Sequence, residues 1–302
     1  MAETEKLKQA LDAAGVAWRG GEPLAAHCTF RIGGPAAVFV QPASRGQICK
    51  AILLCRETGV RYFLLGNGSN VLFSDAGFSG AVIDLSQSAG EAELLPDGRV
   101  CAGAGLMLSR LCTAARDAGL SGLEFAYGIP GTVGGAVYMN AGAYGGEIKD
   151  VLTRVEVLTA DGRVETREAS QLELSYRHSV FEHSGECILR AYFQLHPADP
   201  AVIHAAMEEL MGRRRAKQPL EYPSAGSTFK RPAGAFAGAL IEQCGLRGFR
   251  VGGAAVSEKH CGFVVNLGGA SCADVLELCG TVSRIVYEKT GYRLEKEVRV
   301  VE

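Results

Sequence analysis

The chain has 302 residues, of which 47% are hydrophobic and 21% are charged, as in ordinary soluble globular proteins. This length predicts two domains or one large domain. A formal net charge of −2 provides no global basic field for nucleic acid or an anionic membrane, and no apolar run is long enough to span a bilayer. We therefore expect no nucleic-acid partner and no membrane insertion.

The ten cysteines include no C-x-x-C pair, and the six histidines are scattered along the chain. This spacing predicts no metal site, because metal ligands cluster in sequence patterns that are absent here. Most cysteines stand in apolar contexts, which indicates buried free thiols in a reducing cytoplasm. The N-terminal residues lack the apolar core of a signal peptide, which also favours a cytoplasmic location.

Helical and extended patterns alternate along the chain. Helices are expected at 5–14, 44–58, 106–118, 201–217, 237–244 and 272–290. Strands are expected at 36–40, 62–65, 81–85, 92–95, 100–102, 151–158, 163–167, 187–195, 262–266 and up to 301. Hairpin turns at 96–98 and 161–162 make the mixture α+β rather than purely parallel. The segment 196–200 is a candidate domain boundary, and 218–232 reads as a loop.

Two glycine-rich segments, 66–70 and 128–146, stand out. So many glycines exclude a helix interior, whereas Ile129, Val133 and Val137 require burial and exclude a free linker. Two interpretations remain for the longer segment: a tightly packed turn, or a cradle whose N–H groups approach a phosphate. Neither the P-loop pattern nor the complete G-x-G-x-x-G pattern is present, so a dinucleotide would bind outside a Rossmann fold.

Four other places could carry chemistry, and each has a structural alternative. Arg177, next to Tyr176, could clamp a carboxylate or form a structural ion pair. Ser227 could donate a proton or merely cap a turn. Glu295, Glu297 and Arg299 would share one face of a strand, and the pattern does not choose between the glutamates. The basic run 213–217 fits a solvated helix end or a diphosphate site.

Five ordered motifs together resemble one enzyme family, the UDP-N-acetylenolpyruvoylglucosamine reductases, from about Thr29 to Val301. The motifs are Gly66-Asn67-Gly68-Ser69-Asn70, Gly128-Ile129-Pro130-Gly131-Thr132-Val133-Gly134-Gly135 with Asn140-Ala141-Gly142-Ala143-Tyr144-Gly145, Tyr176-Arg177, Ala225-Gly226-Ser227-Thr228-Phe229-Lys230 and Leu294-Glu295-Lys296-Glu297-Val298.

The resemblance implies an α+β protein with an FAD-binding domain of the vanillyl-alcohol-oxidase/p-cresol-methylhydroxylase type, followed by an α+β substrate-binding domain. The FAD-binding region would span 1–197, in subdomains of about 1–66 and 67–197. The substrate-binding domain would span 198–302, with a final strand that returns Glu297 to the active site. The implied reaction is the NADPH-dependent, FAD-mediated reduction of UDP-N-acetylglucosamine enolpyruvate to UDP-N-acetylmuramate, for peptidoglycan precursor synthesis in the cytoplasm.

Roles follow from the resemblance residue by residue. Arg177 would activate the substrate carboxylate, Ser227 would donate the proton, and a protonated Glu297 would help to stabilise the enolate-like species. FAD would contact Gly66, Asn67, Gly68, Ser69, Asn70, Val71, Gly128, Ile129, Pro130, Gly131, Thr132, Gly134, Gly135, Asn140, Ala141 and Gly142. Substrate would contact Lys217, Lys230, Arg231, Arg247 and His260.

The interval from Arg177 to Ser227 lacks the insertion that, in one class of the family, carries a tyrosine folding over the substrate. The chain therefore resembles the shorter class, and we expect a monomer or weak oligomer. His260 is followed by Cys261, where alanine is commoner in the family. Two other functions are considered: an FAD oxidase of the same fold, and a non-catalytic binder of sugar nucleotides or phosphate.

Overall fold

The computed structural model describes residues 2–88, 90 and 92–302, and the chain divides into two compact units. The first unit consists of Met1–Arg19, Val38–Asn67 and Gly80–Arg214, and the second of Gly20–Ala37, Gly68–Ser79 and Arg215–Glu302. This division differs from the predicted boundary near 197, because two N-terminal segments belong to the second unit. The roles predicted for the two domains stay predictions.

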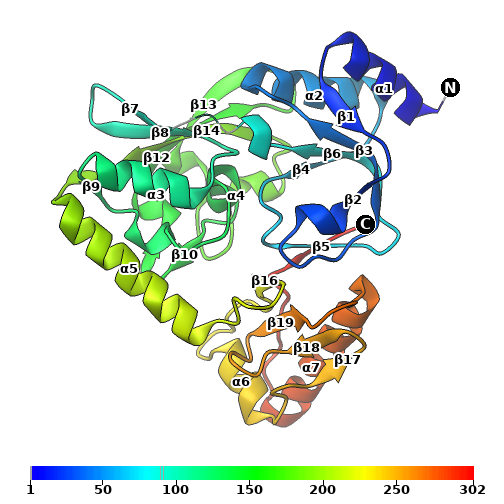
Figure 1. Ribbon diagram of the computed structural model, residues 1–302, viewed down its shortest axis with the longest axis vertical. Coiled ribbons are helices and arrows are strands. Elements are labelled where there is room, and N and C mark those ends of the chain that lie inside the picture. Colours follow the sequence, from blue (N-terminus) through cyan, green and yellow to red (C-terminus); the bar gives the residue numbers. More distant parts are fainter. Residues whose placement is uncertain (1, 89, 91) are drawn as a thin grey trace. The chain divides into compact units, whose positions relative to one another are not determined.

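Helices and strands alternate throughout the chain (Figure 1). The α-helices are α1 (Glu3–Ala13), α2 (Arg45–Thr58), α3 (Leu108–Asp117), α4 (Val133–Tyr138), α5 (Pro200–Lys217), α6 (Ala237–Gln243) and α7 (Cys272–Thr290). The strands up to the middle of the chain are β1 (Ala17–Arg19), β2 (Glu22–Pro23), β3 (Pro35–Gln41), β4 (Tyr62–Leu65), β5 (Val71–Phe73), β6 (Phe78–Asp84), β7 (Glu93–Leu94), β8 (Arg99–Gly103), β9 (Leu120–Ser121), β10 (Gly142–Ala143) and β11 (Gly146–Glu147). The remaining strands are β12 (Leu152–Leu158), β13 (Val164–Glu168), β14 (Cys187–Gln194), β15 (His196–Pro197), β16 (Ser224–Ser227), β17 (Arg250–Val251), β18 (Ala254–Val256), β19 (Phe263–Asn266) and β20 (Arg299–Val301).

The N-terminal part of the first unit is a sheet with strand order β1-β3-β6-β4, in which β4 and β6 are parallel. Helices α1 and α2 share one hydrophobic core with this sheet, formed by residues such as Leu11 and Ile52. The Ser44 side chain caps α2 by accepting a hydrogen bond from Gln47 N at 3.3 Å. Gly59 ends the helix with a φ of 73°, a conformation that favours glycine.

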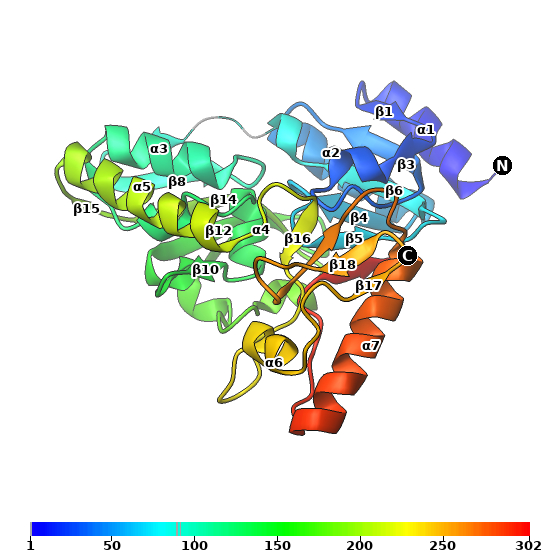
Figure 2. The same ribbon diagram turned by 60° about the horizontal axis from the view of Figure 1, so that its bottom comes forward.

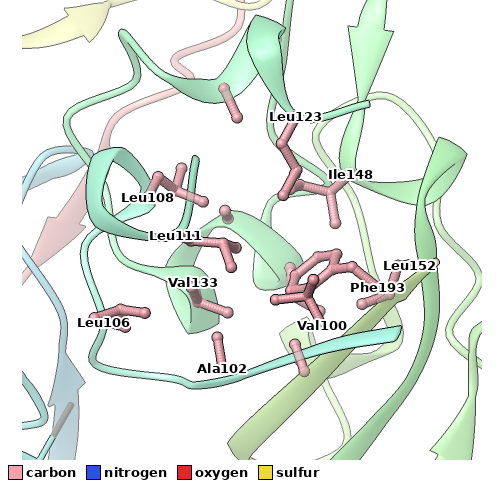
Figure 3. Close-up of a cluster of buried hydrophobic side chains, with 14 of the residues drawn as sticks. Val100, Ala102, Leu106, Leu108, Leu111, Leu123, Val133, Ile148, Leu152 and Phe193 are labelled. Atoms are coloured by element: carbon pink, nitrogen blue, oxygen red, sulfur yellow. The ribbon is translucent and has the colours of Figure 1, made fainter. Parts of the chain in front are cut away.

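The second sheet of this unit has the order β13-β12-β14-β8-β7, and all its neighbouring strands are antiparallel. Side chains of α3 and α4 gather over it, and Figure 3 shows Leu111 and Val133 near Val100 and Phe193. Helix α5 runs alongside α3 (Figures 1 and 2), and its Met207 is buried in the same core. Helices α3, α4 and α5 therefore share one hydrophobic core with this sheet.

The second unit contains an antiparallel sheet with order β16-β19-β18-β17, against which α7 packs. The same unit also contains the pair of β5 with β20, which run parallel although they lie far apart in sequence. Helix α7 begins with a capping box, because Ser271 Oγ accepts from Asp274 N and an Asp274 carboxylate oxygen accepts from Ser271 N, both at 3.0 Å. It ends at Gly291, whose φ is 76°.

Most predicted elements are present, and the strand predicted at 62–65 is β4 with the same bounds. Three predictions were wrong. The segment 128–146 contains a helix, α4, although its glycines seemed to exclude one. The predicted loop 218–232 contains β16. Glu297 does not lie in the final strand, because β20 begins at Arg299. In each case contacts with distant parts of the chain outweigh local propensity.

All ten cysteines are free, and every one except the half-buried Cys49 is buried, as the sequence predicted. Within residues 2–88, 90 and 92–302, no group of three or more His, Cys, Asp or Glu side chains could hold a metal ion. Within the same residues, no helix combines the length and the apolar character that crossing a membrane requires.

The α7 cap predicts a measurable loss of stability. Replacing Ser271 by alanine removes the Oγ acceptor of the Asp274 N–H, and we expect the free energy of unfolding to fall by about 1 kcal/mol. The control is Glu277→Ala on the exposed face of the same helix, which should change it by less than about 0.5 kcal/mol. Urea unfolding followed by circular dichroism measures both; equal effects would contradict the assigned role of the cap.

The buried thiols predict selective labelling. Burial raises the pKa of Cys55, Cys112, Cys187 and Cys279 to about 12, so almost no reactive thiolate exists near neutral pH. A thiol reagent such as DTNB should therefore modify Cys49 first in the native protein and all ten cysteines only after denaturation. Cys49→Ser should abolish the fast phase, and a fast phase that persisted in this variant would refute the expectation.

Candidate functional site

The two glycine-rich segments meet in the first unit. Asn67 Nδ2 donates to the Pro130 carbonyl oxygen at 2.7 Å. A Cβ atom at Gly66 would lie only 2.4 Å from Thr132 Oγ1, so only glycine fits this position without a shift. The structure thus brings together the segments from which the sequence predicted a common cradle.

Backbone hydrogen bonds hold the longer segment against the residues that follow β8. Gly134 N donates to Ala104 O at 2.7 Å, and a Cβ atom at Gly134 would stand 2.8 Å from that of Ala104. Thr132 caps α4 through a bond from Gly135 N to its Oγ1 at 3.4 Å. Gly134 is therefore needed for packing, whereas Gly135 is exposed. The contacts of Gly134 agree with the packed turn, and the cradle stays a prediction.

The turn that follows β4 carries unused donors. Among the described residues, no hydrogen-bond acceptor lies in reach of the N–H groups of Asn67, Gly68 and Ser69. Gly68 adopts a φ of 60°, in the left-handed region. Successive N–H groups in such a turn form a concavity that suits an anion.

Arg214 is a candidate site residue that sequence reasoning did not single out. Its side chain lies against Gly128, because a Cβ atom there would be 3.1 Å from Arg214 Cδ. Its Nε is buried without a hydrogen-bond partner in the described part of the chain, and burial lowers the pKa of the guanidinium. A desolvated cation of this kind fits an anionic ligand. The only signal in the sequence was its place in the basic run that ends α5.

Arg177 lies in a tight turn of the first unit, between Ser175 and His178. Ser175 and His178 exchange two backbone hydrogen bonds, both at 3.2 Å, and Arg177 adopts a φ of 55°. Its Nη2 donates to the Gly142 carbonyl oxygen at 3.4 Å, and its guanidinium carbon lies 5.1 Å from the centre of the Tyr176 ring. The predicted carboxylate clamp is thus attached to the glycine-rich segment.

Ser227 and the segment before β20 are held together in the second unit. Glu297 N donates to Thr228 O at 2.8 Å, and Asn70 Nδ2 donates to the Glu297 carbonyl oxygen at 3.2 Å. Thr228 is buried and its Oγ1 accepts from Val264 N at 2.9 Å. Ser227 itself is exposed, and its hydroxyl has no partner among the described residues. Hydrogen bonds therefore hold the backbone next to this exposed hydroxyl.

The two glutamates that the pattern left equal differ in the structure. The Glu295 side chain is 75% exposed and lies 3.8 Å from Lys230 Nζ as an ion pair. Glu297 is only half-exposed. Because its backbone is bonded to both Thr228 and Asn70, its main chain is fixed beside that of Ser227. This difference favours Glu297 as the active-site residue.

Two of the predicted substrate residues act on a third, His260, in the second unit. Burial lowers the pKa of His260, and the cations of Arg247 and Lys217 lower it further. Nδ1 of His260 accepts a hydrogen bond from Gly262 N at 3.1 Å, which places the proton of the neutral ring on Nε2. Arg247 also pairs with Glu242, so part of its charge is compensated.

The other predicted site residues divide between the two units. Ile129, Pro130, Gly131, Ala141 and Gly142 belong to the first unit, whereas Val71, Lys230 and Arg231 belong to the second. Arg231 lies over the Phe236 ring, at 4.8 Å from its centre. Asn140 is fully buried and donates to the Ser175 carbonyl oxygen, so its side chain faces the Arg177 turn. Cys261, next to His260, is 4% exposed.

Comparison with known proteins finds two domain families in the chain. Residues 36–167 match the profile of an FAD binding domain, and residues 218–301 match the C-terminal domain of UDP-N-acetylenolpyruvoylglucosamine reductase. The reductase of Agathobacter rectalis is 50% identical over 93% of this chain and 92% of its own. That of Syntrophomonas wolfei is 47% identical over 93% of both chains. The crystal structure of the Thermus caldophilus enzyme aligns with a TM-score of 0.79 and 38% identity, over 95% of this chain and 99% of that one.

Proposed function

Because this chain belongs to the UDP-N-acetylenolpyruvoylglucosamine reductase family, we propose that it reduces UDP-N-acetylglucosamine enolpyruvate to UDP-N-acetylmuramate with NADPH. The chain is an oxidoreductase of peptidoglycan precursor synthesis and carries an FAD-binding domain next to the family's C-terminal domain. The observation that carries the proposal is the 50% identity to a named reductase over 93% of the chain. This membership weighs against both the oxidase and the non-catalytic binder.

The residues of the glycine-rich segments fit FAD. The unused N–H groups of Asn67, Gly68 and Ser69 are suited to a diphosphate, and the unpartnered Nε of Arg214 is suited to a negative group of the cofactor. Exposed Gly135 lets a flat ring or a phosphate approach the backbone without a Cβ atom in the way. When bound, FAD supplies the redox chemistry by passing a hydride from NADPH to the enolpyruvyl methylene carbon.

Arg177 is assigned to the carboxylate of the enolpyruvyl group. Negative charge moves towards this carboxylate as hydride arrives, and a fixed guanidinium stabilises that charge without reorganising at the moment of reaction. The contact with Gly142 O and the Tyr176 ring restrict the orientation of Arg177 before the substrate binds.

Ser227 is assigned as the proton donor to the ether-bearing carbon. A serine hydroxyl is a weak acid, so it acts in this way only if it is held rigidly against a strongly basic carbon. Support comes from the backbone around it, because Gly226 has a φ of 75° and the next residue, Thr228, is buried and hydrogen-bonded. Glu297, beside Thr228, is assigned to stabilise the enolate-like species.

The sugar-nucleotide groups of the substrate are assigned to Lys217, Arg247 and neutral His260, with Lys230 and Arg231 nearby in sequence. The cations of Arg247 and Lys217 both act on His260, and cations grouped in this way are suited to an anionic ligand such as the UDP diphosphate. We also retain as proposals the cytoplasmic location, the monomeric or weakly associated state, and the membership of the shorter class. We also propose that residues 1–197 bind FAD and that residues 198–302 bind the substrate.

The cofactor assignment of Arg214 leads to one prediction. Arg214→Ala should raise the dissociation constant of FAD on the order of tenfold or more, because a charge-assisted hydrogen bond is worth about 1.5–3 kcal/mol. Fluorescence quenching of FAD on titration with apoprotein measures it. Arg163→Ala removes an arginine that is 71% exposed in the β12–β13 hairpin and should leave FAD affinity unchanged. If Arg214→Ala binds FAD as tightly as wild type does, Arg214 does not contact the cofactor.

The proton-donor assignment leads to another. In Ser227→Ala, flavin reduction by NADPH should stay at the wild-type rate, whereas reoxidation by UDP-N-acetylglucosamine enolpyruvate should slow by roughly 10²–10⁴-fold, the usual contribution of a general acid. Stopped-flow absorbance of the flavin separates these two half-reactions. Ser224→Ala, at the other end of β16, is the control. Rapid reoxidation in Ser227→Ala would show that another group donates the proton, and an inactive wild type would refute the reductase activity itself.

A further inference from the structure

The backbone of the Arg177 turn needs external support. A non-glycine residue with a φ of 55° occupies the left-handed region, at a cost on the order of 1 kcal/mol. The two bonds between Ser175 and His178, both at 3.2 Å, close the turn but do not connect it to the rest of the unit. Some contact must therefore hold the turn in place relative to the glycine-rich segment.

Two buried side chains provide such contacts: one is Ser179, whose Oγ donates to the Tyr138 carbonyl oxygen at 2.6 Å after the turn, and the other, at the start of the turn, is Asn140. Its side chain is completely buried, and its Nδ2 donates to the Ser175 carbonyl oxygen and to Glu147 Oε2, both at 3.0 Å. Its Oδ1 accepts from Lys149 N at 2.9 Å. Both amide hydrogens and the amide oxygen are thus engaged within the chain. The side chain links the first residue of the Arg177 turn to the β10–β11 hairpin.

The same hairpin contacts Arg177 directly. Gly142, which accepts from Arg177 Nη2, pairs with Glu147 across β10 and β11. Hydrogen bonds from Lys149 and then Asn140, together with the charge of Arg177, hold the pKa of the Glu147 carboxyl below its usual value. Glu147 is therefore anionic at neutral pH, which fixes Asn140 as a donor towards it.

We propose that Asn140 is a positioning residue for Arg177. Its buried amide holds the Ser175 end of the turn on the β10–β11 hairpin, and so aims the guanidinium at the substrate carboxylate. This role rests on the proposed function, in which Arg177 acts when substrate accepts the hydride. It assigns the Asn140 side chain to the support of a catalytic residue, whereas the family resemblance implied contact with FAD.

The test uses the full-length, FAD-loaded enzyme and the variant Asn140→Asp. Aspartate has the same size, tolerates a φ of 39° and still accepts from Lys149 N, but it places an acceptor opposite Ser175 O and Glu147. We expect reoxidation of the flavin by UDP-N-acetylglucosamine enolpyruvate to slow on the order of 10–100-fold, because small displacements of a positioned group cost this much. Flavin reduction by NADPH and FAD affinity should stay within about twofold of wild type, since Arg177 takes no part in either.

Double variants separate positioning from general damage. In an Arg177→Ala background, Asn140→Asp should slow reoxidation by less than about twofold, because the group that it positions is gone. Thr159→Ala, which removes three hydroxyl bonds to Asp161 and Arg163 in the β12–β13 hairpin, should leave both half-reactions unchanged. Full additivity with Arg177→Ala, or equal losses in both half-reactions and in FAD affinity, would overturn the proposal.

Two further variants cover a failure to fold. Asn140→Gly accepts the same backbone conformation and removes all three side-chain bonds, so it should show the same selective loss. Glu147→Ala removes one acceptor of Nδ2 from a half-buried position and should slow the same half-reaction by a smaller factor. Wild-type speed in any folded Asn140 variant would refute the positioning role. An inactive wild type would instead refute the proposed function.

Discussion

The first unit depends on a steric constraint: at two glycines, a neighbouring residue lies so close that a Cβ atom would not fit. Gly66 touches Thr132, and Gly134 touches Ala104, at distances that any side chain would violate. These contacts fix the position of α4 and of the turn after β4, and with them the donors of Asn67 and the exposed backbone at Gly135. Close packing at these glycines therefore positions the backbone segments to which we assign the cofactor.

The second unit uses main-chain bonds where the first uses close packing. Ser227 and Glu297 stand on segments joined through Thr228, whose N–H, carbonyl and hydroxyl groups all bond to neighbouring backbone. Backbone bonds in a buried segment leave little freedom for the side chains that they carry. A weakly acidic group such as a serine hydroxyl would react faster in this arrangement, because a fixed orientation lowers the entropy cost of reaching the transition state.

The sequence predicts the elements with strong periodicity and clear end signals, such as the helix from Ser44 to Gly59 and the strand at 62–65. It fails where distant contacts decide: α4 forms among glycines because Thr132 caps it and Ala104 and Leu106 bind its first N–H groups. The catalytic candidates come from the resemblance to a family, and the structure adds the hydrogen bonds that hold them. Asn140 bonds to residues up to 35 positions away in the sequence, and no local sequence pattern predicts such bonds.

The pairing of β5 with β20 has a consequence for how the protein is made. Val71–Phe73 finds its parallel partner only in Arg299–Val301, so this pair cannot form until the ribosome has released more than two hundred further residues. By then, the long segment Gly80–Arg214 of the first unit has already left the ribosome with its core residues complete. The bond from Asn70 to the Glu297 carbonyl oxygen also cannot form before this stage. The main chain around Glu297 therefore reaches its final conformation only after this long segment of the first unit has left the ribosome.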